Sequence, residues 1–192
     1  MIQKLKKLFR SKAFWENAAI ILFGVIIYLG FRITIQPYYV SGPSMESTYQ
    51  PGERLWVNKL EYKSHGPARG DVIVFRQPNV SVTPLIKRVI GLPGETVMIT
   101  DGIVSVKKTD GTVIVLQEPY IKGPFNTTYD SVIIPPGEYF VMGDNRNNSL
   151  DSRYGWFAAG DKIIGQAWVS YWPPGLWGGS HIYRQPAAAA AH

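Results

Sequence analysis

The sequence predicts a mainly β protein: a coiled antiparallel β-sheet or barrel-like domain behind one N-terminal transmembrane helix. Three observations support this prediction. A long apolar stretch lies near the N-terminus. From Val40 onward, short runs rich in β-branched and aromatic residues alternate with turn signals that contain Gly, Pro or Asp. No stretch of helical period follows the apolar one, apart from a single turn expected near 158–161, and this favours an antiparallel fold over alternating strands and helices.

The first twelve residues carry most of the charge of the chain. Its formal net charge is +6, and residues 1–12 contain five Lys or Arg residues but no acid. The remainder is nearly neutral and offers no basic stripe for nucleic acid, so no nucleic-acid partner is expected. Cations are retained on the cytoplasmic side of a span, which predicts a cytoplasmic basic segment 1–12 and an extracytoplasmic remainder.

The apolar stretch is predicted to be a transmembrane helix over 13–35. No charged residue occurs between Ala18 and Phe31, and the stretch has roughly the 20 residues that cross a bilayer. A cleaved secretory signal and a buried core helix are the alternatives. Cleavage is disfavoured because the stretch runs on into Arg32 and Pro37 without a small-x-small site. We therefore expect a single-pass protein of the cell (plasma) membrane, with membrane lipid as one partner.

The part beyond the membrane, 36–184, is expected to form one domain of short strands. Two Asp-Gly pairs, at 101–102 and 110–111, mark a three-strand meander across 95–116. The Ala-rich residues 185–192 are expected to be a disordered tail. The strand-like runs are 54–60, 71–76, 84–90, 95–100, 102–108, 111–116, 131–135, 138–143 and 162–172.

The residue inventory removes several kinds of catalysis. Cysteine is absent, so thiol nucleophiles, thiolate metal sites and disulfides are excluded. Of the three histidines only His65 could serve a Ser-His-Asp triad, and a lone loop histidine is more often a surface residue. There is no close His pair and no phosphate loop. A calcium loop starting at Asp144 would put Arg146 at a ligand position, which a cation cannot fill. No metal and no cofactor are expected.

A hydroxyl nucleophile with a lysine base remains. The ordinary lysine pKa of ~10.4 must fall by roughly two to three units for such a base to work at neutral pH, at a cost of ~3–4 kcal/mol that burial can supply. Lys87 is the best candidate, because PLIKRVIGLPG surrounds it with apolar neighbours on a predicted strand. Arg88 beside it cannot lose its proton. An ordinary exposed strand lysine is the alternative, and spacing alone leaves it open.

Three segments, in order behind the anchor, resemble a known family. SGPSMEST contains Ser44, LIKRVIGLPGETV contains Lys87, and GDNRNNSLDSRYG contains Ser149. Together they are similar to type I signal peptidases of the bacterial kind, and the resemblance runs from QPYYV at residue 36 to VSYWP at residue 169. It implies a membrane-bound serine endopeptidase that removes signal peptides from exported preproteins by a Ser/Lys dyad through an acyl-enzyme.

The resemblance also implies roles for the matching residues. Ser44 would be the nucleophile and Lys87 the general base, while the Ser149 hydroxyl would orient the lysine amine. Backbone N–H groups at Ser44 and Gly42 would form the oxyanion hole. The family usually has proline where this chain has Ser47, and this puts the rigidity of the turn after the nucleophile in doubt.

Further residues match supporting positions of the family. Asp151 and Arg153 match a structural ion pair that holds their loop near the dyad, with Asp144 beside it, although a solvated turn would explain the same residues. Shallow apolar pockets would accept small P1 and P3 side chains, the Ala-x-Ala preference, or the same positions could be plain core. The matching pocket positions are Val40, Tyr49, Leu85 and Ile86.

Other functions stay open beside this one. A related peptidase with another task, such as a conjugation-type enzyme or a self-cleaving repressor, would share the chemistry. A catalytically silent, membrane-tethered β module is the alternative from another class. At the carboxyl end, AWVSYWPPGLWGG places Trp168 in the expected core. Trp172 and Trp177, beside prolines and glycines, are expected to be exposed and to touch the outer bilayer surface.

Overall fold

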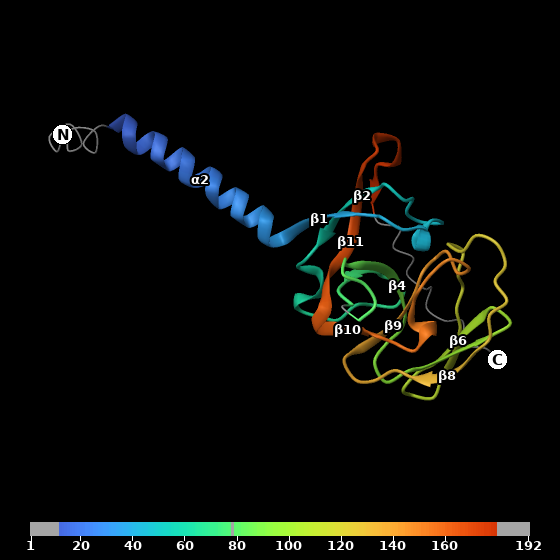
Figure 1. Cartoon of the computed structure of the whole chain (residues 1–192). Helices are drawn as coiled ribbons and strands as arrows, with labels where there is room; N and C mark the ends of the chain where they lie inside the picture. The colour runs from blue at the N-terminus through green and yellow to red at the C-terminus, as the bar shows by residue number, and fades with distance from the viewer. Residues whose placement is uncertain (1–11, 78, 180–192) are drawn as a thin grey trace.

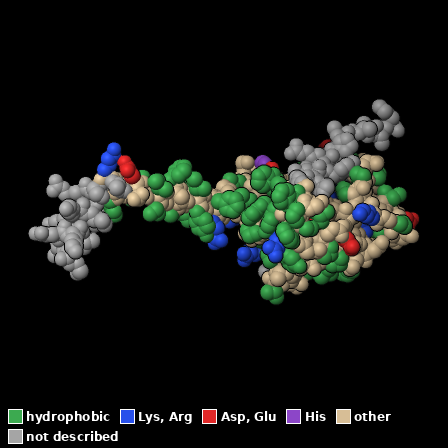
Figure 2. Space-filling view, turned by 90° about the horizontal axis from the view of Figure 1, so that it is seen from above, with side chains coloured by type: hydrophobic (Ala, Val, Ile, Leu, Met, Phe, Trp, Pro, Cys, Tyr) green, Lys and Arg blue, Asp and Glu red, His purple; other side chains and the backbone are tan. Residues whose placement is uncertain are grey.

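The computed structural model describes residues 12–77 and 79–179, and its N-terminal helix stands apart from a β domain (Figure 1). The predicted tail and almost all of the predicted basic segment lie outside these residues. Helix α2 (Lys12–Thr34) contains an apolar stretch, Phe14–Thr34, that is long enough to cross a membrane. Most of its apolar side chains are exposed, and most of the helix stands clear of the domain (Figure 2). A helix that exposes apolar side chains along its length fits a single-pass membrane anchor.

Strand β1 (Ile35–Tyr39) follows α2 without a loop, so the anchor is joined directly to the sheet. It pairs antiparallel with β2 (Arg54–Asn58) and lies at the edge of the sheet. The sequence did not predict this strand. Pro37 cannot donate a ladder hydrogen bond and is tolerated only because one side of β1 is unpaired.

The larger sheet is curled and antiparallel, with the strand order β1-β2-β11-β3-β4-β9-β10 and with β12 paired to β11. Strand β11 lies between β2 and β3 in this order, although it comes late in the chain. It therefore joins residues that are far apart in sequence. The remaining strands of this sheet are β3 (Val72–Phe75), β4 (Leu85–Gly91), β9 (Glu138–Met142), β10 (Ala158–Ala159), β11 (Ile163–Trp172) and β12 (Gly178–Gly179).

The smaller sheet has the order β7-β6-β5-β8 and contains the predicted meander. Its strands are β5 (Thr96–Thr100), β6 (Ile103–Lys107), β7 (Val113–Val115) and β8 (Tyr129–Ile133). Asp101 and Gly102 join β5 to β6 with φ values of 48° and 80°. Two left-handed residues make the tight turn that matches strand twist, which explains the Asp-Gly pair. The mainly β prediction is confirmed, and each predicted strand-like run overlaps a strand.

Three buried clusters hold the domain together. One joins the two sheets, because it contains Ile90 and Phe140 of the large sheet together with Val97 and Val104 of the small one. The other two lie on opposite faces of β4: Ile86 packs in the second cluster, and Val89 packs in the third. Alternation along β4 thus sends neighbouring side chains into different parts of the core.

A row of aromatic side chains continues from the C-terminal end of α2 across the domain, and we call it the aromatic edge. The Phe31 ring meets Trp56 edge-on at 5.3 Å, and Trp56 stacks on Tyr171 at 4.6 Å. Trp172 and Trp177 extend it and are 51% and 69% exposed. The prediction that these two are exposed is confirmed. A last aromatic residue, Trp168, was expected in the core but is 47% exposed, because on β11 it points away from the buried face.

Candidate active site

Ser44 lies in a short 3-10 turn, η1 (Pro43–Met45), just after β1. Gly42 precedes the turn in an extended conformation, with φ −120° and ψ 163°. Met45 is fully buried and anchors the turn in the core, whereas Ser44 is half-buried. The backbone N–H of Asn145 donates to the Ser44 carbonyl at 3.0 Å, and the Asn145 side-chain amide donates to the preceding carbonyl at 3.1 Å. The turn is therefore tied to the loop that follows β9.

Lys87 lies in the middle of β4, opposite Ile73 of β3. It is only 3% exposed, and it takes part in no ion pair within the described residues. Burial lowers the pKa of the Lys87 ammonium from 10.5 to about 8, against the opposing charges of Asp151 and Asp144. A neutral amine, which a general base needs, is therefore accessible near neutral pH.

The pairing of β4 with β9 shows on which face the Lys87 side chain leaves the sheet. Arg88 lies opposite Met142 in this antiparallel pair. Extending the same register by one residue places Lys87 opposite Gly143, directly after β9. Opposed residues of an antiparallel pair direct their side chains to the same face. The space beside the Gly143 Cα is therefore also the space toward which Lys87 points.

The Ser149 side chain and the backbone carbonyl of Ser44 occupy that space. A Cβ added at Gly143 would come within 2.3 Å of the Ser149 Oγ and 2.5 Å of the Ser44 carbonyl oxygen. Any side chain at Gly143 would therefore displace both serines. Fold and register thus bring Ser44, Lys87 and Ser149 to one place, although their side chains share no hydrogen bond within the described residues. In enzymes without substrate such contacts are commonly long and tighten on binding.

The loop between Gly143 and Arg153 is held by a buried carboxylate. Asp151 is fully buried and accepts from the Gly143 N–H at 3.0 Å and from the Arg153 Nε at 2.8 Å. Arg153 also donates to the Arg146 carbonyl at 2.8 Å. The Ser149 Oγ inside this loop is buried and has no hydrogen-bond partner among residues 12–77 and 79–179. Asp151 therefore holds the two ends of the loop together, and the Ser149 hydroxyl beside Gly143 is available for a further hydrogen bond.

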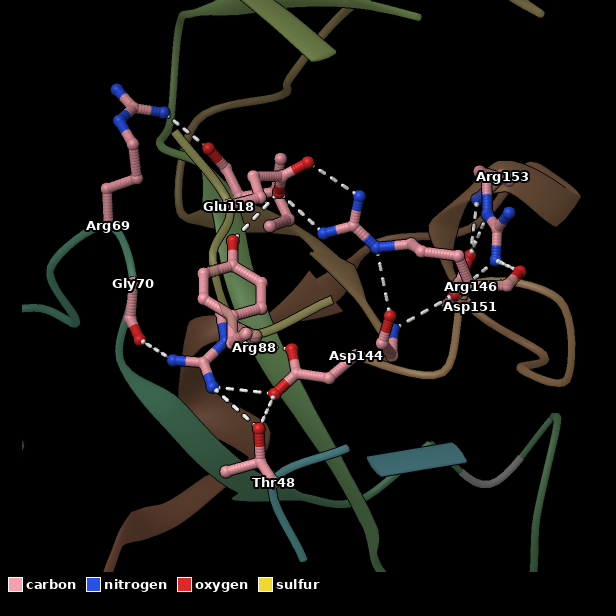
Figure 3. A network of polar contacts seen from close by, with 12 residues as sticks. Thr48, Arg69, Gly70, Arg88, Glu118, Asp144, Arg146, Asp151 and Arg153 are labelled. Atoms are coloured by element: carbon pink, nitrogen blue, oxygen red, sulfur yellow. Dashed lines mark hydrogen bonds and ion pairs between the residues drawn. The ribbon is translucent and has the colours of Figure 1, made fainter. Parts of the chain in front are cut away.

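On the other face of β4, Arg88 forms a fully buried ion pair with Asp144 (Figure 3). Its Nε and Nη2 donate to the two carboxylate oxygens at 2.8 and 2.6 Å, and its Nη1 donates to the Gly70 carbonyl at 2.7 Å. Thr48, four residues after Ser44, also donates to this carboxylate. The pair fastens the Ser44 turn, β4 and the start of the Gly143 loop to one another.

A second ion pair extends this network into the segment after the small sheet, and the sequence did not predict it. Arg146 donates to both Glu118 oxygens at 2.8 and 2.5 Å. The centroid of the Tyr120 ring lies 4.0 Å from the Arg88 guanidinium carbon, so this ring covers the cation of the first pair. Glu118 and Tyr120 follow β7 in a stretch without periodicity, so no local pattern could have indicated their partners.

The other expected site residues lie in the core or at its margin, and His65 lies in an exposed loop. Val40, Tyr49 and Ile86 are buried in the second cluster, and Leu85 packs against the third while half-buried. His65 is exposed in a loop, where its Nδ1 lies 3.0 Å from the Gly66 carbonyl. Within residues 12–77 and 79–179, no group of three or more His, Asp or Glu residues is placed to hold a metal ion.

Comparison with known proteins gives consistent matches. A family model described as "Signal peptidase, peptidase S26" matches residues 14–172. A probable signal peptidase I-1 of Synechocystis is 39% identical over 171 residues, 85% of each chain. Signal peptidase I of Leptolyngbya laminosa is 38% identical, over 82% of this chain and 79% of that one. Signal peptidase IB of Staphylococcus aureus is 35% identical, over 78% and 84%.

Among solved structures, a signal peptidase I from Enterococcus faecalis V583 is 31% identical and aligns with a TM-score of 0.43, covering 52% of this chain and 95% of that one. The family match spans most of the chain, from the anchor to the end of β11, and the relatives are matched over most of their own lengths. The chain therefore belongs to the signal peptidase family, peptidase S26, and is a serine peptidase.

Proposed function

We propose that this chain removes signal peptides from exported preproteins, with Ser44 as the nucleophile and Lys87 as the general base. The observation that carries this proposal is the state of Lys87. Its amine is buried without an ion pair within the described residues, and burial lowers its pKa to about 8. A buried ammonium destabilises a fold, and such groups cluster where catalysis needs them. The relatives named signal peptidase I supply the reaction class.

In the proposed reaction, the Ser44 Oγ attacks the scissile carbonyl carbon while its proton passes to the Lys87 Nζ. The C–N bond of the tetrahedral intermediate then breaks, and the Lys87 ammonium gives this proton to the leaving amine of the mature protein. An ester between Ser44 and the signal peptide remains. Water attacks this acyl-enzyme as Lys87 accepts a proton from it, and that proton returns to the Ser44 oxygen when the signal-peptide carboxyl group leaves. The scheme uses no metal and no cofactor.

Two further groups assist in this proposal. The Ser149 hydroxyl is buried beside Gly143 and has no hydrogen-bond partner in the described part of the chain, so it can accept a hydrogen bond from the Lys87 amine and orient it. The Ser44 N–H lies in the first turn of η1, where amides lack an intrahelical acceptor, and can donate to the oxyanion. A Cβ at Gly42 would meet nothing within 4 Å, so the space beside Gly42, two residues before Ser44, is open.

A preference for Ala-x-Ala is proposed from the packing near Ser44. Val40, Tyr49 and Ile86 are at most 5% exposed and already fill the core, while Leu85 is half-buried. Because close-packed residues leave few voids between them, we expect shallow depressions on their outer side and no deep pocket. Small P1 and P3 side chains fit such depressions, whereas larger ones would require the core to shift.

Cleavage is tested with full-length protein, an intact preprotein and sequencing of the new N-terminus. We expect cleavage after a small residue, lost in Ser44→Ala and in Lys87→Arg, because a guanidinium keeps its proton. Ser105→Ala and Lys107→Arg on β6 are matched controls that should keep wild-type rates. Near-normal turnover of Lys87→Arg would show that the lysine is not the base.

We propose that α2 crosses the plasma membrane with the basic segment in the cytoplasm, and that the aromatic edge touches the outer surface. Five cations precede the span, and the aromatic edge starts at its outer end. Since the chain has no cysteine, a single spin label can be attached at Leu176→Cys, beside Trp177 and 44% exposed. In vesicles it should be accessible to oxygen, whereas a label at Ile133→Cys on β8, 70% exposed, should be accessible to an aqueous nickel chelate. Aqueous behaviour at both positions would contradict docking.

A further inference from the structure

A cleft of about 1030 Å³ lies where the anchor meets the domain, and we call it the basic cleft. Its walls are η2 (Glu61–Lys63) with the loop after it, η4 (Gly160–Lys162) with the start of β11, and the residue after β3. None of its lining residues takes part in the site described above. The Tyr62 ring forms part of the floor, and the glycine at Gly66 lets the loop approach Tyr139 closely.

The position of the basic cleft along α2 puts it at the depth of lipid headgroups. Ile33, in the last turn of α2, and Gln36, in β1, both line it. The Lys59 N–H donates to the Thr34 carbonyl at 2.9 Å, so this wall is joined to the end of the helix. Headgroups occupy roughly 5–8 Å beyond each face of the hydrocarbon. A cleft that begins at the last turn of the span therefore opens into that layer.

The cleft carries an excess of positive charge. Four cations line it, Lys59, Lys63, Arg76 and Lys162, against a single acid, Asp161. Lys162 pairs with Asp161 at 2.8 Å. Lys59, Lys63 and Arg76 have no ion pair within the described residues. Three cations around one opening repel each other unless an anion joins them, so the lining is complementary to a negative group.

Two acids that adjoin this lining, Asp71 and Glu61, each accept hydrogen bonds. Asp71 is buried behind the cleft, where it accepts from the Tyr62 hydroxyl at 3.0 Å and from the Gln166 amide at 3.1 Å. Glu61 accepts from the Asn58 amide at 3.1 Å. Neither carboxylate lines the cleft.

We propose that the basic cleft binds the phosphate of an anionic phospholipid of the outer leaflet. This inference rests on the proposed membrane span and outward domain. Guanidinium and ammonium groups bind phosphate oxygens well, and cations at a bilayer surface favour anionic lipids. Ile33 and Leu60 in the lining supply apolar surface beside the cations for the glycerol end of the acyl chains. A headgroup therefore fits better than a free phosphate, which would use only the cations.

The bound lipid would set the tilt of the domain. Phe31, which begins the aromatic edge, and Ile33, which lines the cleft, are two residues apart on α2 and so point about 200° apart around the helix. The aromatic edge and the basic cleft thus contact the bilayer on opposite sides of the anchor. A single pivot would leave the domain free to rock, whereas two opposed contacts hold Ser44 at one height above the membrane.

The test counts lipids retained on full-length protein by native mass spectrometry in detergent. We expect one palmitoyl-oleoyl phosphatidylglycerol to bind more tightly than phosphatidylcholine. Lys63→Gln with Arg76→Gln should weaken it about 25-fold, from about fivefold for each cation. Lys63→Arg with Arg76→Lys should restore it. Lys107→Gln with Lys108→Gln, the same charge change in β6 and the turn after it, is the matched control and should have no effect.

Several results would overturn the proposal. Equal weakening by the control pair would mean that binding depends on net charge alone. Equal retention of phosphatidylcholine, or equal competition by soluble glycerol 3-phosphate, would remove the anionic lipid as the ligand. Unchanged lipid retention in Lys63→Gln with Arg76→Gln, together with a raised KM for a preprotein, would assign the cleft to substrate. Ser44→Ala should retain the lipid although it cannot cleave, so lipid binding and the proposed cleavage are tested independently of each other.

Discussion

Replacing Lys87 with methionine is predicted to stabilise the protein while abolishing cleavage. Methionine keeps most of the length and the apolar character of the lysine stem but has no titratable group. Lys87 is 3% exposed, and burial lowers its pKa from 10.5 to about 8. The folded state therefore holds a charge that the unfolded state solvates more favourably. Removing that charge should raise the free energy of unfolding.

The magnitude and the pH range follow from this pKa. A fall of about 2.5 units at about 1.4 kcal/mol each makes the cost about 3 kcal/mol. Below pH 8 both states keep the proton on Lys87, so the full cost is present. Between about pH 8 and pH 10.5 the folded state loses the proton first and the cost fades, and above this range both states are neutral. The gain from Lys87→Met should thus be largest at pH 6–7 and vanish toward pH 10.5.

Thermal unfolding of full-length protein in detergent measures this gain. For a chain of this size, about 3 kcal/mol corresponds to a rise in Tm of about 6–12 °C at pH 6.5. Lys107→Met is the control, because Lys107 is exposed on β6 and should change stability by less than about 0.5 kcal/mol at any pH. Destabilisation by Lys87→Met at pH 6.5, or a gain that does not change with pH, would refute the reasoning.

Three further predictions concern the site. The kcat/KM for cleavage should rise about tenfold per pH unit up to the Lys87 pKa of about 8 and then level off, and a plateau already reached at pH 6.5 would indicate another base. Ser149→Ala should lower kcat about 10- to 100-fold with little change in KM or in the free energy of unfolding. Ser47→Ala also removes a buried hydroxyl that has no partner within the described residues, but it should leave kcat unchanged. Equal losses of kcat in the two variants would contradict an orienting role for Ser149. Arg88→Met should destabilise the protein by about 3–5 kcal/mol in denaturant unfolding, because it leaves Asp144 buried and unpaired. Adding Asp144→Leu should recover most of that loss. A cost below about 1 kcal/mol for Arg88→Met alone would contradict this prediction.

Local patterns were sufficient for the anchor and for most strands. The apolar stretch before Ile35 and the Asp101-Gly102 turn depend on nearest neighbours in sequence, and the structure contains both the helix and the tight turn. β1 was missed because it continues an apolar helix without a break and contains Pro37, which local rules exclude from strands. Trp168 was placed in the core because a large aromatic side chain on a strand is usually buried, but β11 turns it outward.

The sequence by itself determined the class of fold, the apolar anchor, and the short list of hydroxyl and amine groups that could act together. Only the tertiary structure decided whether Lys87 is buried, because periodicity cannot tell which face of β4 meets other elements. It also decided that Gly143 brings Ser149 and Ser44 together, and that Arg88 finds Asp144 across 56 residues. Such long-range contacts arise from strand register and close packing, which depend on all the strands at once and are not written in any one segment.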